Sequence, residues 1–164
     1  MSGCLVVAEL GVNANGSRDT LLALVRAAHG SGASAIKVQV RTPELHADPL
    51  KMRESCTAPV GELISELEHR RRLELSDDDL WALHAECRRL GLEWFASCWD
   101  VPSLARMRSW DMLFYKLASA YVTDLALVRA TREAADETGA TVIASTGATT
   151  ESECDALMDV LGPA

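Results

Sequence analysis

The chain has 164 residues, of which 48% are hydrophobic and 24% charged, enough for one globular domain with a core. Its net charge of −8 and sequence pI near 5.0 argue against anionic partners, so we expect neither nucleic acid nor membrane as a partner. The five cysteines form no CxxC pair, and the first residues lack a basic signal region and a cleavage site. We therefore expect reduced thiols and a cytoplasmic protein.

Short apolar runs alternate with amphipathic stretches along the chain and predict repeated strand–helix units. The predicted strands are residues 5–10, 35–40, 93–97, 112–119 and 141–145. The predicted helices are residues 20–28, 62–72, 76–90, 101–110, 123–139 and 151–161, and residues 41–61 form a long predicted loop. Strands that are apolar throughout, each followed by a helix, indicate a parallel sheet covered by helices.

Two architectures fit this order of elements: an open doubly wound sheet, or part of a (β/α)8 barrel. No GxGxxG or GxxxxGK[ST] motif follows a predicted strand. Its absence counts against an open sheet that binds nucleotides. In both architectures a ligand would bind at the carboxyl ends of the strands.

Polar side chains occur at these strand ends, although the strands are otherwise apolar. Lys37 and Gln39 are two residues apart and therefore point to the same face of their strand. A buried ammonium group is costly unless a partner compensates its charge. The strand ends contribute Glu9, Lys37, Gln39, Ser97, Asp100, Lys116, Ser119, Ser145 and Thr146.

Two lysines in one cavity, together with several hydroxyl groups, predict a site for a small phosphorylated carboxylate. Glu9 adds an acceptor for a sugar hydroxyl or for a proton. Structural alternatives stay open at this point: a strand lysine can lie at a solvent edge, a Ser-Thr-Gly sequence can be only a turn, and Glu9 can simply pair with a lysine. The combination over several strand ends favours a binding site.

The histidines and tryptophans carry no comparable signal. The histidines have no spacing typical of metal ligands, and we expect all of them to lie away from the strand ends: His29, His46, His69 and His84. The tryptophans near the third predicted strand are expected to be packing residues: Trp94, Trp99 and Trp110.

Six stretches resemble the N-acetylneuraminate (sialic acid) synthase family, in the family's order and across nearly the whole chain. They are AELGVNANG (8–16), AIKVQVRTPEL (35–45), HRRRLELS (69–76), EWFASCWD (93–100), YKLASAYVTDLALVR (115–129) and VIASTGATTESE (142–153). Each stretch alone is weak, and their combination is specific. The resemblance implies an α/β fold over residues 1–164: the N-terminal part of a (β/α)8 TIM barrel, with about five βα units and parallel strands.

Members of this family are transferases of carbohydrate biosynthesis that condense phosphoenolpyruvate with an N-acylated amino-sugar aldehyde. The products are a nine-carbon 2-keto sugar acid and phosphate. The resemblance implies that Lys37 and Lys116 hold phosphoenolpyruvate and that Glu9 orients the acceptor sugar, which makes these three the catalytic candidates. The implied substrate-binding residues are Gln39, Ser97, Ser119 and Ser145.

The sequence departs from the family pattern at single residues and in length. Ala14 replaces a histidine of the family's first turn, and Tyr121 stands where an acidic residue is usual. A barrel needs eight strands and typically about 250 residues. We therefore expect strands six to eight, the small C-terminal domain and the family's two metal-binding histidines to lie outside residues 1–164.

The family's divalent metal, Mn or Mg, would then have no ligand in this chain. Beyond phosphoenolpyruvate and the amino-sugar aldehyde, the expected partner is a second copy or a complementary C-terminal half, because a partial barrel exposes two sheet edges. We expect the residues that face its half-empty interior to include Val6, Ala8, Val142 and Ala144.

Whether this chain is itself an enzyme stays open. One alternative is a non-catalytic truncated remnant or interaction module of the same fold. The other is a different phosphoenolpyruvate-using barrel aldolase, of the 3-deoxy-octulosonate phosphate synthase type.

Overall fold

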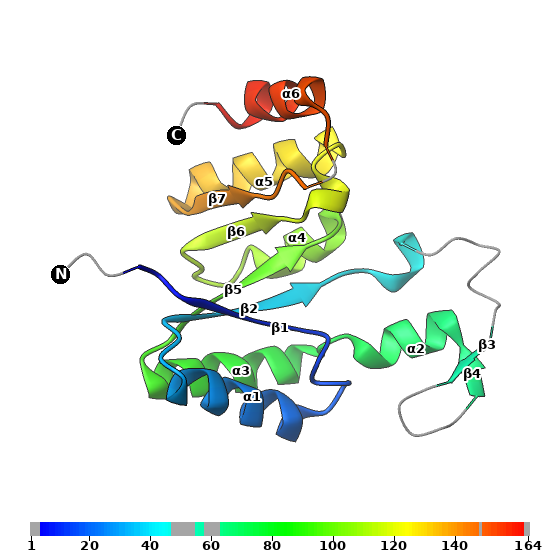
Figure 1. The fold of residues 1–164 in the computed structure, drawn as a ribbon, viewed down its shortest axis with the longest axis vertical. Coiled ribbons are helices and arrows are strands. Elements are labelled where there is room, and N and C mark those ends of the chain that lie inside the picture. Colours follow the sequence, from blue (N-terminus) through cyan, green and yellow to red (C-terminus); the bar gives the residue numbers. More distant parts are fainter. Residues whose placement is uncertain (1–3, 47–54, 58–62, 148, 163–164) are drawn as a thin grey trace.

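The computed structural model describes residues 4–46, 55–57, 63–147 and 149–162, and a parallel sheet lies at its centre. Its strands, in spatial order, are β1 (Val7–Gly11), β2 (Ala35–Val40), β5 (Glu93–Cys98), β6 (Phe114–Leu117) and β7 (Thr141–Ala144). Figure 1 shows that their carboxyl ends point to the same side of the molecule, on the right of the view. Spatial order follows chain order without reversal, as in a (β/α)8 barrel and unlike a doubly wound sheet. The fold is therefore α/β, and the sheet is part of a barrel.

The helices confirm the predicted alternation, and local capping explains where several of them begin. They are α1 (Arg18–Gly30), α2 (Glu66–Leu73), α3 (Asp77–Leu90), α4 (Val101–Met107), α5 (Leu125–Thr138) and α6 (Glu151–Leu161). Ser17 caps α1, and Ser76 forms a capping box with Asp79 at the start of α3. Helices α1 and α3 pack side by side (Figure 1). Within the described ranges, no helix has the length and apolar character that a membrane crossing needs.

The segment between β2 and α3 differs most from the sequence prediction. It contains the antiparallel pair β3 (Ser55–Thr57) and β4 (Leu63–Ser65). The predicted helix over residues 62–72 begins only at Glu66, because β4 occupies the residues before it. The other residues of the predicted loop and helix start, 47–54 and 58–62, lie outside the described ranges. The short strands and α2 lie on the same side of the sheet as the carboxyl ends (Figure 1).

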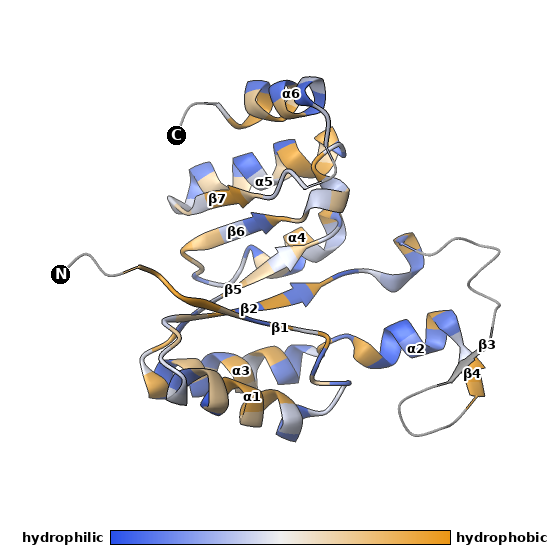
Figure 2. Ribbon diagram, in the orientation of Figure 1, coloured by the Kyte–Doolittle hydropathy of each residue, from blue (hydrophilic) through white to orange (hydrophobic). Residues whose placement is uncertain are grey.

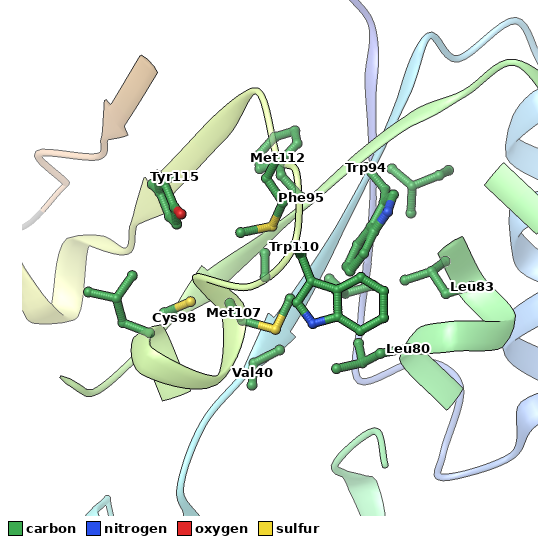
Figure 3. Packing of buried hydrophobic residues seen from close by; sticks show 14 of the residues in the cluster. Val40, Leu80, Leu83, Trp94, Phe95, Cys98, Met107, Trp110, Met112 and Tyr115 are labelled. Carbon is green, nitrogen blue, oxygen red and sulfur yellow. The ribbon is translucent and has the colours of Figure 1, made fainter. Parts of the chain in front are cut away.

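The strand register separates two faces of the sheet. Glu9 lies opposite Lys37, and Gln39 opposite Ser97, which in turn lies opposite Lys116. The alternate residues of these strands are buried under the helices. Figure 3 shows this core around Trp94 and Trp110, which pack beside Leu80 and Leu83 of α3. Figure 2 shows the contrast with α2, which is mostly hydrophilic and has no buried residue.

The expected set of interior residues was wrong in part. Val142 and Ala144 line a hollow with residues of α5 and α6, so they face the helices. Ala8 lies opposite the fully buried Ile36, on the same helix-covered face. Val6 precedes β1 and is 53% exposed. Side chains alternate along a strand, and a displacement of one residue in the expected register reverses every assignment.

The turn after β1 is fixed by a close backbone contact. Gly16 has a φ of +71°, and a Cβ atom there would lie 2.0 Å from the carbonyl oxygen of Arg72. Only glycine fits both the left-handed backbone and this approach. The contact joins the turn after β1 to the end of α2, at the carboxyl side of the sheet.

Candidate functional site

Lys37 projects from β2 on the face of the sheet that the helices do not cover. Its Nζ atom forms an ion pair with Glu9 and donates a hydrogen bond of 3.0 Å to Ser97 Oγ. The lysine side chain is only 16% exposed, whereas Glu9 is 44% exposed. The lysine is thus held between β1 and β5, with its partner carboxylate toward solvent.

Lys116 projects from β6 on the same face, on the other side of β5. Its Nζ atom donates 2.6 Å hydrogen bonds to Ser145 Oγ and to the carbonyl oxygen of Leu117. Ser119 lies beside Gly147, where an added Cβ atom would be 3.8 Å from the serine hydroxyl. The second lysine therefore sits among the loops that follow β6 and β7, near two serine hydroxyls.

Gln39 extends the cluster toward β1. Its Nε2 atom donates a long hydrogen bond of 3.4 Å to Glu9 Oε1. Gly11, with a φ of +52°, ends β1 beside them, and a Cβ atom there would lie 3.2 Å from both of these polar atoms. A glycine at this position leaves room for the Glu9–Gln39 contact.

The two lysines influence each other electrostatically. Burial, together with the positive charge of Lys116, lowers the pKa of Lys37 to about 8. The Glu9 carboxylate favours the charged amine and so opposes this shift. Burial likewise lowers the pKa of Lys116. A lysine whose charge is disfavoured gains from a bound anion, which would stabilise the ammonium form.

The structure brings all seven predicted residues to the carboxyl side of the sheet, in two groups. Direct contacts join Glu9, Lys37, Gln39 and Ser97 into the first group. Lys116 and Ser145 form the second, with Ser119 close by. Strand pairing between Ser97 and Lys116 connects the groups. Each ammonium group has three donors, so both keep a donor for a ligand.

His46 is a polar residue that we did not predict at the carboxyl side of the sheet. The expectation that it lies away from the strand ends was wrong: its Nε2 atom is 2.7 Å from Asp100 Oδ2, just after β5. It follows the 3₁₀ turn Pro43–Leu45, inside a loop without periodicity. Because this loop has no periodic pattern, its residues carry no signal for the position of His46.

Asp100 is the acceptor that holds this loop in place. It accepts hydrogen bonds from the Thr42 backbone N–H (2.7 Å), the Thr42 hydroxyl (2.9 Å) and the Ser103 backbone N–H (2.7 Å). Burial alone would raise the pKa of Asp100, but these hydrogen bonds and the one from His46 outweigh it and lower the pKa. Its oxygens are fully used, so it acts as an anchor between the β2 and β5 loops.

Arg41 and Trp99 form another contact that we did not predict. The Arg41 guanidinium forms an ion pair with Glu74 and lies 4.9 Å from the centre of a Trp99 ring. Arg41 and Glu74 are 8% and 14% exposed. Trp99 therefore packs at the opening of the sheet, two residues after Ser97, rather than in the core beneath the helices.

The described residues do not suit a metal ion. In residues 4–46, 55–57, 63–147 and 149–162, no group of three or more His, Cys, Asp or Glu side chains is placed to hold one. Glu9 is engaged by Lys37 and Gln39, and the His46–Asp100 pair is engaged by the Thr42 loop. We therefore derive no chemical step through a metal.

A hollow of about 640 Å³ lies elsewhere, between α5, β7 and α6. Its lining includes the exposed Met158 and the helix-facing Val142. Arg132 and Asp136 at its edge pair with each other. We place the site at the strand ends because the half-buried lysines and their hydroxyl partners gather there.

Fold and site together define the class of protein: a βα-barrel protein with two half-buried lysines at the carboxyl ends of its strands. A sequence model of the NeuB family matches residues 24–163. This match covers most of the chain, and the chain belongs to the NeuB family.

Individual relatives agree with this assignment. An N,N'-diacetyllegionaminic acid synthase of Legionella pneumophila is 30% identical over 123 residues, which are 74% of this chain and 35% of that protein. The N-acetylneuraminate-9-phosphate synthase of Mus musculus is 26% identical over 116 residues, 71% of this chain and 32% of that protein. This chain spans about a third of the length of both relatives.

A solved structure confirms the fold. The N-acetylneuraminic acid synthetase from Leptospira borgpetersenii serovar Hardjo-bovis, in complex with citrate, superposes with a TM-score of 0.79 at 21% sequence identity. The superposition covers 96% of this chain and 49% of that chain. At this identity the similarity concerns the fold alone.

Proposed function

We propose that this chain binds phosphoenolpyruvate and contributes that site to a synthase of the sialic acid type. The observation that carries the proposal is the pair of half-buried lysines, each hydrogen-bonded to a serine hydroxyl at a strand end. Phosphoenolpyruvate carries a phosphate and a carboxylate on the same carbon, C2, and two separated ammonium groups match two anionic groups. Family membership supports the same substrate class.

The proposed reaction joins phosphoenolpyruvate to an N-acylated amino-sugar aldehyde. C3 of the enol phosphate forms a bond to the aldehyde carbon, whose oxygen takes up a proton. Water adds at C2, the bond between C2 and the phosphate oxygen breaks, and the water oxygen remains as the 2-keto oxygen. The products are a nine-carbon 2-keto sugar acid and inorganic phosphate.

Each described residue has a role that follows from its contacts. Lys37 and Lys116 would hold the anionic groups and stabilise the charge that develops on the departing phosphate. Ser97 and Ser145 would turn their hydroxyls from the lysines to the ligand oxygens. Glu9, the most exposed of the group, would accept a hydrogen bond from the acceptor sugar or take its proton.

The complete reaction is proposed for the assembled enzyme. The chain spans about a third of its curated relatives, so the remaining groups, including any ligands for Mn or Mg, would come from outside residues 1–164. Protein that has this fold and binds the anion without turnover would correspond to the non-catalytic alternative. We propose a cytoplasmic location because the described cysteines are free thiols, as is usual in a reducing compartment.

Calorimetry with phosphoenolpyruvate tests the proposal. We expect saturable binding that is tighter than the binding of inorganic phosphate or pyruvate, because only the complete ligand engages both lysines. Equal affinity for phosphate alone would indicate an unspecific phosphate site, and no saturable heat with any of the three would refute the proposed function.

A further inference from the structure

The ion pair between Glu9 and Lys37 covers the solvent side of the first lysine. The Lys37 side chain is 16% exposed and that of Glu9 is 44% exposed, so the carboxylate lies on the solvent side of the ammonium group. Ser97 Oγ accepts a second hydrogen bond from the same ammonium group, at 3.0 Å. An anion that approaches from solvent therefore meets the negative charge of Glu9 before it reaches Lys37.

The second lysine is not covered in this way by any described residue. Lys116 Nζ donates 2.6 Å hydrogen bonds to Ser145 Oγ and to the Leu117 carbonyl oxygen, and both of these acceptors are neutral. In the strand register, Lys116 lies opposite Ser97, the residue that Lys37 contacts. The site thus contains one uncovered cation and one covered cation on the same face of the sheet.

Glu9 and a ligand anion compete for the same ammonium group. Burial and the positive charge of Lys116 disfavour the charged form of Lys37 and lower its pKa to about 8, and Glu9 supplies a compensating negative charge from within the chain. Lys37 keeps a third donor. An anion on that donor would lie close to the Glu9 carboxylate, and the two negative charges would repel each other.

The Glu9 side chain is weakly held apart from this ion pair. Its other hydrogen bond within the described residues comes from Gln39 Nε2 at 3.4 Å, beyond the usual range for such bonds. The register of β1 against β2 shifts between Glu9 and Gly11, so Glu9 stands where regular strand pairing ends. Water solvates an exposed carboxylate that leaves its partner, and exposed ion pairs contribute little net stability. Displacement of this side chain therefore costs little.

We propose that Glu9 makes an autoinhibitory contact: its carboxylate occupies Lys37 in the free protein, and an anionic group of the ligand must displace it. The inference rests on the proposed function, because phosphoenolpyruvate is the anion that displaces Glu9. The uncovered Lys116 receives the first anionic group of the ligand, and Lys37 receives the second. The displaced carboxylate is then free for the hydroxyl or proton contact proposed above, so Glu9 acts only after the anion has bound.

Calorimetry with phosphoenolpyruvate and with inorganic phosphate tests this contact, at about pH 6.5 so that Lys37 stays charged without its partner. Glu9→Gln removes the charge and keeps the shape of the side chain, and it should bind phosphoenolpyruvate roughly three- to ten-fold more tightly than wild type. Glu9→Asp keeps the charge but withdraws it by one methylene group, so it should give a smaller gain. Glu93→Gln, which removes the same charge from an exposed position at the amino end of β5, is the matched control and should bind as wild type does.

The two probes separate this inference from the proposed function. Phosphoenolpyruvate that binds wild type more tightly than phosphate does, with no gain in Glu9→Gln, would overturn the autoinhibitory contact alone. A gain for inorganic phosphate in Glu9→Gln, without any preference for phosphoenolpyruvate, would keep the contact and leave an unspecific phosphate site in place of the proposed function. No saturable heat in any variant would overturn both.

The variants separate direct contact from a general effect of charge. An equal gain in Glu93→Gln would overturn the inference, because net charge alone would then explain the tighter binding. A gain in Glu9→Gln that is absent from Glu9→Asp would overturn it too, because repulsion at a distance would then be sufficient.

Discussion

The two site lysines differ in what holds each ammonium group. Lys37 has a carboxylate partner in Glu9, whereas the partners of Lys116 among the described residues are neutral oxygens, from Ser145 and the Leu117 carbonyl. A cation solvated by neutral dipoles alone is the less compensated of the two. Lys116 should therefore gain more from a bound anion than Lys37 does.

Replacement of Lys116 should weaken the binding of phosphoenolpyruvate more than replacement of Lys37 does. Lys116→Met removes a charge-assisted hydrogen bond, worth roughly 1.5–3 kcal/mol, which corresponds to an affinity about ten- to a hundred-fold lower. Calorimetry measures the loss. Arg129→Met, which removes one positive charge from an exposed position on α5, is the matched control and should bind normally. Unchanged affinity in Lys116→Met would rule out its role.

The pKa of Lys37 predicts how binding depends on pH. That pKa lies at about 8 in the free protein, so the amine is charged at pH 7 and mostly neutral at pH 9. A phosphate monoester is already fully ionised above about pH 7. If only the charged amine binds, affinity should fall about ten-fold between pH 7 and pH 9.

The Lys37→Arg variant tests the origin of this dependence. Arginine stays charged over the whole interval, and its affinity should not fall between pH 7 and pH 9, whatever its absolute value. A wild-type affinity that is flat over this interval would show that Lys37 does not titrate there in the binding-competent protein.

At the scale of elements, Asp100 connects the loop after β2 to the start of α4. Asp100→Ala would remove a helix cap and leave the Thr42 backbone N–H buried without an acceptor. We expect the free energy of unfolding to fall by about 2–4 kcal/mol. Denaturant titration measures this, with the exposed Asp111→Ala as a control within about 0.5 kcal/mol of wild type.

The acid dependence of stability gives Asp100 a second signature. Its pKa is lowered in the folded protein, so its contribution is present above the unfolded pKa and is lost as the pH falls through the lower, folded pKa. Asp100→Ala should therefore lose less stability than wild type on acidification below about pH 4. An identical acid response in both proteins would contradict the anchor role.

The elements with a clear period were predictable, and those without one were not. Lys37 and Gln39 interrupt an apolar strand at alternate positions, so their shared face followed from strand geometry alone. The β3–β4 pair has only three residues on each side and lies in a proline-containing segment, too short for any pattern. His46 meets Asp100 across 54 positions of the chain, a contact that local sequence does not encode.

At the scale of the whole molecule, the sheet ends in two open edges. Within the described residues, β1 pairs only with β2, and β7 pairs only with β6. Each edge presents backbone N–H and C=O groups without strand partners, a known template for pairing with another chain. Apolar side chains lie beside them: Val6 before β1 is 53% exposed, and Met158 near β7 is 52% exposed.

We predict that the chain associates through these edges, with a second copy or with a complementary half. A barrel closes only with eight strands at a fixed tilt and shear, and the hollow between α5, β7 and α6 offers about 640 Å³ for side chains of another chain. Light scattering at micromolar concentration should therefore give a mass above the 17.7 kDa of one chain.

Met158→Glu, which places a charge in that hollow, should shift the population toward the monomer. Trp81→Glu adds the same charge on α3, which packs on the inner strand β5, and should not. A cooperatively melting wild-type monomer of 17.7 kDa with full synthase turnover would refute the prediction.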